Sequence, residues 1–242
     1  MNLIKTSAIG STNDYLKMLS VNSDLPNFTV VFTENQTQGK GQRGTVWKSN
    51  PLNSLTFSVF HRFTFQKTEQ LFSWNILITK AIIKGLEQLG LTKNCVKWPN
   101  DILAGNRKIC GILIENQIKN ESEIYSVVGI GINVFDTEFE HLPQAGSILS
   151  VYGQMIDKMQ LLETIVEQIK LLANDFPLNE ENLWDFYLEN LFRKNQVSTF
   201  ELPNQRKIVG IIKGVNRQGK LIVLHEDDIE VLYNLKEIKL LY

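Results

Sequence analysis

Apolar residues recur along this chain with two different periods, and each period predicts a different kind of element. Runs rich in β-branched and aromatic residues predict strands at 28–33 and 54–60. Between 68 and 89, leucine, isoleucine and phenylalanine recur near helical spacing, and Gly90 follows as a C-cap. The chain therefore mixes helices with strands.

The same reasoning predicts further elements up to residue 194, after which the pattern changes. The later strands are "NCVKW", "KICGILIEN" and "EIYSVVGIGINV", and the later helices are "QLLETIVEQIKLLANDF" and one around 180–192. A short helix begins at "STN", whose three polar residues are good caps. From 195 onward, short alternating strands are joined by polar turns, with "RQGK" as a hairpin signal. We therefore expect an α+β domain over 1–194 and a small all-β domain over 195–242.

The composition is that of a globular protein without a strong electrostatic field. The chain has 242 residues, of which 43% are hydrophobic and 21% charged, and its net charge is −1. This balance gives no reason to expect binding to nucleic acid or to an anionic membrane. No apolar run approaches the length of a membrane span, about 18 residues, and the start has no signal-peptide pattern, so we expect a cytoplasmic protein. Cys95 and Cys110 lack metal-ligand spacing, which predicts buried free thiols.

The stretch "TENQTQGKGQRGTVWKSN" (33–50) is long and polar for a connection between two strands. Gly39 and Gly41 predict backbone with positive φ that comes close to a ligand. Backbone N–H groups in such a turn can surround an anion, and Lys40 and Arg43 add positive charge beside them. The spacing fits neither a Walker motif nor a dinucleotide-binding motif. An anion-binding loop and an ordinary turn both stay open on this segment alone.

The segment "VKWPNDILAGNRKICGILIE" (96–115) has a lysine at the end of a strand. Lys97 there can neutralise a carboxylate or an α-phosphate, whereas the simpler interpretation is a surface lysine beside a tryptophan. Asn100 and Asp101 follow in a sharp turn and can hold a hydrated magnesium ion, or simply be polar turn residues. Both interpretations of each residue stay open at this point.

The strand "VVGIGINV" (127–134) is interrupted by Gly129 and Gly131, which predicts close approach of a ligand or of another part of the backbone. Asn133 is polar within an apolar run and needs hydrogen-bond partners if it is buried. An amide offers a donor and an acceptor together, as recognition of adenine requires. The strand is therefore a candidate for nucleotide binding.

Taken together, four of these segments resemble the biotin protein ligases. They are "STN" at 11–13, "QTQGKGQRGTVW" at 36–47, "KWPNDILAGNRKICGILIE" at 97–115 and "GIGINV" at 129–134. The resemblance extends from about residue 5 to the end of the chain. It implies an α+β fold with a mixed β-sheet flanked by helices, as in class II synthetases, and a small C-terminal SH3-like β-barrel.

The reaction that this resemblance implies has two steps and uses ATP with Mg²⁺. Biotin's carboxylate attacks the α-phosphate of ATP, which gives biotinyl-5′-adenylate and pyrophosphate. A lysine amine of a biotin carboxyl carrier protein then attacks this mixed anhydride and releases AMP. Both steps bring charged groups together and need protection from water, so we expect the loop at 33–50 to be a mobile cover over biotin and phosphate.

The resemblance also implies roles for individual residues. Lys97 would be the catalytic cation between the biotin carboxylate and the α-phosphate, with Arg43 as a second catalytic cation, and Asp101 would be a metal ligand. The implied biotin-binding residues are Ser11, Thr12, Asn13, Gln36, Lys40, Gly41, Gln42, Lys97 and Gly111. The implied nucleotide-binding residues are Lys40, Arg43, Trp47, Asn100, Lys108 and Asn133, with Glu115 shaping the same pocket.

The glycine motif departs from the family's usual G-R-G-R-x-G, because residues 39–44 read "GKGQRG". Lys40 keeps the charge of an arginine but loses its bidentate fork. Gln42 replaces the arginine that helps to retain the adenylate. We therefore expect either that Arg43 compensates or that the intermediate is held less tightly.

The resemblance also bears on partners. Some members of the family carry an N-terminal winged helix-turn-helix and act as repressors, but here "STN" begins at residue 11, so we expect a ligase without a repressor function. A homodimer is a further expectation, since relatives often pair through sheet edges. His61, on a predicted strand, is expected to be a structural or surface side chain rather than a catalyst.

Two other functions stay open. A lipoate or octanoate ligase or transferase of the same superfamily would use similar acyl chemistry, although "KWPND" beside the glycine motif argues against it. A non-catalytic biotin or nucleotide sensor would need the pocket, but not Lys97 together with a positive loop. Without the resemblance, the residues alone predict no more than an α+β enzyme that handles anions.

Overall fold

The computed structural model of the chain describes residues 2–65, 67–119, 123–140 and 142–242, and the side chain of Arg43 lies outside that description. Within these residues the strands form two sheets, which we call the large sheet and the small sheet. The large sheet contains, in spatial order, β1 (Asn2–Ile9), β2 (Thr29–Gln36), β3 (Ser54–Thr64), β7 (Glu123–Asn133), β6 (Arg107–Ile118), β5 (Asp101–Ala104) and β4 (Asn94–Lys97). The small sheet contains, in spatial order, β11 (Glu230–Tyr233), β10 (Leu221–His225), β9 (Lys207–Val215), β8 (Val197–Glu201) and β12 (Lys239–Leu241).

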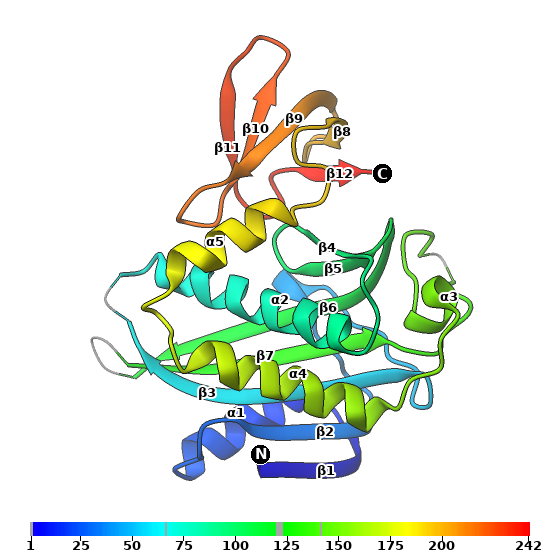
Figure 1. Cartoon of the computed structure of the whole chain (residues 1–242), viewed down its shortest axis with the longest axis vertical. Helices are drawn as coiled ribbons and strands as arrows, with labels where there is room; N and C mark the ends of the chain where they lie inside the picture. The colour runs from blue at the N-terminus through cyan, green and yellow to red at the C-terminus, as the bar shows by residue number, and fades with distance from the viewer. Residues whose placement is uncertain (1, 66, 120–122, 141) are drawn as a thin grey trace.

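Helices cover both faces of the large sheet. They are α1 (Thr12–Asn22), α2 (Gln70–Gln88), α3 (Ile148–Tyr152), α4 (Lys158–Ala173) and α5 (Glu180–Glu189). Figure 1 shows α2 and α4 in front of the large sheet, α1 behind it, and the small sheet above them beyond α5.

The alternation of side chains along the central strands explains this two-sided arrangement. Val30 and Val59 point into the main core under α2 and α4, whereas their neighbours Val31 and Phe60 join a smaller cluster with Leu16 of α1. Both faces of these strands are therefore apolar, and each needs a helix to cover it.

The predicted helices and most of the predicted strands are present, but β1, β5 and α3 were not expected. β1 pairs parallel with β2 and forms an edge of the large sheet, so it is only partly buried and shows no clear apolar alternation. β5 has four residues and directly follows the turn that the sequence predicted. Short or edge strands of this kind give weak periodicity.

The small domain is consistent with the expected SH3-like domain, except that its sheet does not close into a barrel. Its strands pair antiparallel throughout, but among the described residues no ladder joins the two edge strands β11 and β12, so the sheet is open. The edge strands have four and three residues, which leaves little backbone to close a ring. The α+β class is confirmed and the closed barrel is not. The domain boundary at 194/195 stays a prediction.

Neither cysteine forms a disulfide within the described residues, and both thiols stay protonated at neutral pH. Cys110 is buried and Cys95 is partly buried. Burial raises the pKa of Cys95 to about 11 and raises that of Cys110 further. Among the helices that the structure describes, none has the length and apolar character needed to cross a membrane.

Candidate active site

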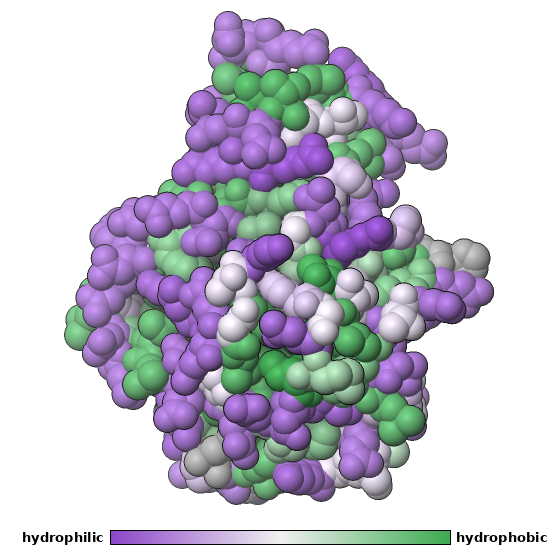
Figure 2. Space-filling model, turned by 45° about the vertical axis from the view of Figure 1, so that its right-hand side comes forward, coloured by the Kyte–Doolittle hydropathy of each residue, from purple (hydrophilic) through white to green (hydrophobic). Residues whose placement is uncertain are grey.

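A cavity of about 530 Å³ lies where the large sheet faces the small sheet. Its floor is formed by β6 and β7, and its walls come from the start of α1, the turn between β4 and β5, and the connection from β2 to β3. We call that connection, residues 37–53, the glycine loop. Figure 2 shows apolar atoms exposed beneath the small sheet and hydrophilic atoms around them.

Most of the site residues expected from the sequence line this one cavity. They are Ser11, Thr12, Asn13, Gln36, Lys40, Gly41, Gln42, Trp47, Lys97, Asn100, Asp101, Lys108 and Gly111. Asn133 and Glu115 do not line it. The expected contribution of the Arg43 side chain lies outside the described residues.

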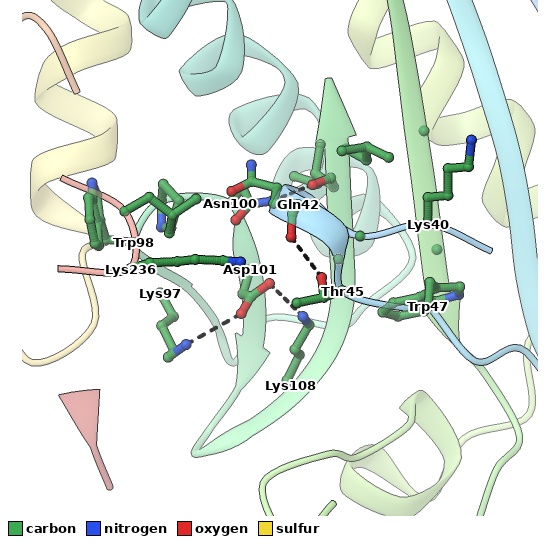
Figure 3. Close-up of a pocket in the computed structure, with 18 of the residues that line it drawn as sticks. Lys40, Gln42, Thr45, Trp47, Lys97, Trp98, Asn100, Asp101, Lys108 and Lys236 are labelled. Carbon is green, nitrogen blue, oxygen red and sulfur yellow. Dashed lines mark hydrogen bonds and ion pairs between the residues drawn. The ribbon is translucent and has the colours of Figure 1, made fainter. Parts of the chain in front are cut away.

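Two lysines converge on one carboxylate at the wall of the cavity (Figure 3). Lys97 ends β4, and its Nζ lies 3.4 Å from Oδ2 of Asp101, which begins β5. Lys108 of β6 approaches the other oxygen of Asp101 at 2.7 Å. The Asp101 side chain is only 16% exposed, so the group is shielded from water. With two ammonium groups and one carboxylate, the cluster keeps an excess positive charge that suits an anionic substrate.

Asp101, for which a metal role was expected, is paired with lysines in this structure. Both carboxylate oxygens already accept from lysines, and Asn100 Nδ2 donates to the backbone oxygen of Ile112. Among the described residues, no group of three or more His, Cys, Asp or Glu side chains could hold a metal ion. The described residues therefore offer no cage of side chains for a metal ion, and the metal role of Asp101 stays a prediction, since Mg²⁺ can bind one carboxylate together with substrate phosphates.

The far end of the cavity is neutral and rich in hydrogen-bonding groups. The backbone N–H of Thr12 and its Oγ1 lie 2.9 and 3.1 Å from Gln36 Oε1. Ser58, fully buried on β3, contacts Thr12 Oγ1 at 2.7 Å and donates to Asn13 Oδ1 at 2.6 Å. These contacts fix amide and hydroxyl groups in place before a ligand arrives. Ser58 was not expected from the sequence, although a polar residue within an apolar strand could have marked it.

An ion pair with α1 fixes part of the glycine loop at the wall of the cavity, which Lys40 and Gly41 line. Lys40 turns its amine away from the lysine cluster in Figure 3 and pairs with Asp14 at 2.6 Å. Burial alone would raise the pKa of Asp14, but Lys40 and Lys17 outweigh it and lower that pKa below its ordinary value. Lys17 also pairs with Glu115 at 2.7 Å, and Glu115 accepts from Asn13 Nδ2 at 2.8 Å. Glu115 therefore supports the site from behind.

The backbone of the glycine loop differs from the expectation of positive φ at Gly39 and Gly41. Positive φ occurs at Gly44 instead, whereas Gly41 is extended with φ −113°. Gly39 and Gly41 pack tightly against later residues of the same loop. A Cβ on Gly39 would lie 2.3 Å from Trp47 O, and a Cβ on Gly41 would lie 2.4 Å from Thr45 Oγ1. The loop is thus folded on itself, with Gly41 N–H donating to Thr45 O at 2.7 Å.

Trp47 lies across two of the three glycines of the floor, Gly111 and Gly131. A Cβ on Gly131 would lie 2.3 Å from the indole, and one on Gly111 would lie 2.9 Å from it. The glycine interruption in β7 therefore provides close approach, as expected, but to a side chain of the same chain. Trp47 Nε1 and Gln42 Oε1 are buried and have no hydrogen-bond partner among the described residues.

Asn133 makes a structural contact in this chain, and its expected contact with the nucleotide stays a prediction. It is buried, and its Nδ2 donates to the backbone oxygen of Gly146 at 2.9 Å. It thereby ties β7 to the segment before α3. The small domain also contributes to the site, although the sequence singled out none of its residues: Ile212 and Leu221 of the small sheet and Lys236, between β11 and β12, line the same cavity.

Comparison with known proteins agrees with this geometry. The family model described as the biotin/lipoate A/B protein ligase family matches residues 6–133. The chain is 28% identical over 245 residues to the bifunctional ligase/repressor BirA of Bacillus spizizenii, covering 96% of this chain and 72% of that protein. It is 27% identical to the biotin–[acetyl-CoA-carboxylase] ligase of Mycobacterium tuberculosis, covering 88% of this chain and 79% of that protein.

A solved structure has the same fold. The biotin protein ligase from Aquifex aeolicus in complex with biotin and ATP superposes with a TM-score of 0.78 at 24% identity, covering 99% of this chain and 98% of that one. The similarity includes the small sheet as well as the large one. Because the family model spans more than half of the chain, this protein belongs to the biotin/lipoate A/B protein ligase family.

Proposed function

We propose that this protein is an ATP-dependent biotin protein ligase. It activates biotin as biotinyl-5′-adenylate and then transfers biotin to a lysine of a biotin carboxyl carrier domain. The observation that carries the proposal is a single cavity with a neutral hydrogen-bonding end at Thr12 and Asn13 and a cationic end at Lys97. The names of the ligases from Mycobacterium tuberculosis and Aquifex aeolicus support the same substrates.

In the first step, the two ends of the cavity hold the two ends of biotin. The amide and hydroxyl groups of Ser11, Thr12 and Asn13 bind the neutral ureido ring, and Lys97 faces the carboxylate. A carboxylate oxygen forms a bond to the α-phosphorus of ATP while the bond to the β-phosphate oxygen breaks, and pyrophosphate leaves. Lys97 and Lys108 stabilise the negative charge that gathers on the α-phosphate oxygens. Mg²⁺ is expected to be held by the ATP phosphates rather than by a protein cage.

In the second step, the glycine loop protects the mixed anhydride from water until the acceptor arrives. The neutral amine of the acceptor lysine attacks the carbonyl carbon of the adenylate, the bond to the phosphate oxygen breaks, AMP leaves, and one amine proton is released to solvent. A polar ligand at this place could also pair with Trp47 Nε1 and Gln42 Oε1, which lack partners among the described residues. Desolvation by the loop strengthens each of these contacts.

The proposal extends to partners and location. A homodimer could pair through β1, which forms one edge of the large sheet. A net charge of −1 argues against a nucleic-acid partner. The cytoplasm supplies ATP and keeps thiols such as Cys95 and Cys110 reduced.

Labelling of an acceptor tests the proposal. The purified protein is mixed with Mg-ATP, a biotin-acceptor domain, and either biotin or lipoate, and the acceptor is then weighed by mass spectrometry. We expect a gain of one biotin that depends on ATP. A gain with lipoate alone would identify a lipoate ligase of the same family instead. No gain with either compound, despite binding of biotin, would indicate a sensor.

A further inference from the structure

Tyr242, which directly follows β12, lies against the lysine that the proposed function makes catalytic. The Nζ of Lys97 is 5.7 Å from the centre of the Tyr242 ring and lies over its face. An ammonium group within about 6 Å of an aromatic face is attracted by the ring quadrupole, whose negative end is at the face. Asp101, 3.4 Å from the same Nζ, attracts it from another direction.

The Tyr242 ring is held in place by two other parts of the chain. Phe192, in the segment after α5, meets it edge-on with ring centres 5.0 Å apart. The backbone oxygen of Tyr242 accepts from Gln144 Nε2 at 2.8 Å. Since Tyr242 directly follows β12, which pairs with β8, the ring is also attached to the small sheet.

The same two supports are bonded to the backbone beside both lysines of the cluster. The N–H of Phe192 donates to the oxygen of Val96, next to Lys97, at 2.8 Å. The N–H of Lys108 donates to the oxygen of Gln144 at 2.7 Å. Tyr242 is therefore held by Phe192 and Gln144, two residues that are themselves hydrogen-bonded to the backbone of Val96 and Lys108.

The hydroxyl group of Tyr242 is not suited to act as a base. Burial, followed by the nearby charge of Asp101, raises the pKa of Tyr242 to about 12. The residue is thus a neutral phenol at physiological pH, and the group that it offers to Lys97 is the ring face.

We propose that Tyr242 is a positioning residue for biotin activation: its ring face holds the Lys97 ammonium group at the cavity wall while anionic substrates draw that group away from Asp101. Through Tyr242 the small sheet takes part in the first chemical step. This inference rests on the proposed ligase function, because it needs Lys97 to act on the carboxylate and the α-phosphate.

The test compares ring-keeping and ring-removing variants in single-turnover formation of biotinyl-adenylate. Tyr242→Leu and Tyr242→Met remove the aromatic face, and Tyr242→Phe keeps it. We expect the first two to slow the step by about fivefold to thirtyfold, with biotin affinity changed by less than about twofold, while Tyr242→Phe stays within about twofold of wild type. Tyr233→Leu is the matched control, since Tyr233 belongs to the same sheet but contacts His225.

The outcomes separate this inference from the proposed function. No adenylate from the wild-type protein would contradict the ligase itself. An active wild type with a fast Tyr242→Leu variant, or with a Tyr242→Phe variant as slow as Tyr242→Leu, would overturn the positioning role. An equal loss of rate in Tyr233→Leu would also overturn it, because general loosening of the small sheet would then explain the effect. The methionine variant keeps the test valid if the leucine variant is unstable.

Discussion

Trp47 shows how single residues set the shape of the cavity. Its indole lies directly over Gly111 and Gly131, at distances that leave no room for a Cβ on either strand. Lys108 Nζ lies over the indole, 5.7 Å from its ring centre. Two glycines in the floor therefore position an aromatic wall beside one of the two lysines.

A double-mutant cycle tests this contact. Gly131→Ala should lower the free energy of unfolding by about 1–3 kcal/mol, because the added methyl group collides with the indole. In a Trp47→Ala background the same change should have little effect, since the obstructing ring is gone. Denaturant unfolding of the four proteins measures both values. Equal effects of Gly131→Ala in the two backgrounds would exclude the contact.

His61 is a second residue whose surroundings decide its behaviour. Its ring is stacked between Phe28 and Trp74, with ring centres 4.7 and 5.0 Å away, and it is 7% exposed. Burial lowers its pKa from 6.5 to about 4, so the folded protein binds a proton less readily than the unfolded chain does. The expectation of a structural side chain rather than a catalyst fits this position in the core.

The resulting pH dependence can be measured. The pKa of His61 is lower in the folded protein than in the unfolded chain, so the unfolded chain takes up the proton first as pH falls. The free energy of unfolding is therefore unaffected by His61 above pH 6.5 and decreases as pH falls toward 4. His61→Phe cannot take up this proton, so wild type should lose up to roughly 3 kcal/mol more than the variant between pH 7 and pH 4. Urea unfolding across that range is the measurement. Parallel pH profiles for the two proteins would contradict the buried neutral histidine.

At the scale of elements, the glycine loop and α1 act together. The ion pair between Lys40 and Asp14 joins them, and its side chains are 52% and 42% exposed. An exposed pair contributes little to stability and is weakened by salt. It can therefore bias the loop toward α1 without preventing the loop from opening.

Removal of this ion pair should change how long the intermediate is retained. Asp14→Asn should raise the rate of adenylate release by about twofold to fivefold at low salt, and the difference should shrink as salt is added. Asp24→Asn is the control, because Asp24 pairs with Arg62 away from the cavity. Release from enzyme preloaded with labelled adenylate gives the rates. If Asp14→Asn released adenylate at the wild-type rate at low salt, the ion pair would have no part in retaining the intermediate.

The sequence predicts elements well where the apolar periodicity is strong, and less well where a segment is a strand mainly because it pairs with a neighbouring strand. The strands β2, β3, β6 and β7 carry apolar runs and were predicted, whereas the partly exposed edge strand β1 was not. The lysine and glycine motifs correctly indicated one site, since most of their residues line one cavity. The contact of Asn133 with Gly146 depends on how a distant loop packs, and no local pattern reveals it.

At the scale of the whole molecule, the cavity exists because two sheets face each other. Trp98, in the turn beside Lys97, donates its Nε1–H to the oxygen of Gly219, in the turn between β9 and β10, at 2.9 Å. Ile212 and Leu221 complete the wall from that side. A docking of this kind joins residues far apart in sequence, so the sequence predicted a small β domain but not which of its residues line the site.

The exchange of labelled pyrophosphate into ATP tests the central claim most directly, because it reports reversible biotin activation without an acceptor. Wild type should catalyse exchange only when biotin is present. In Lys97→Ala the exchange rate should be at least about a hundredfold lower, while the unfolding transition should match that of wild type. Lys5→Ala, on the exposed edge strand β1, should match wild type. Exchange that needs no biotin, or exchange at near-wild-type rate in Lys97→Ala, would contradict the account.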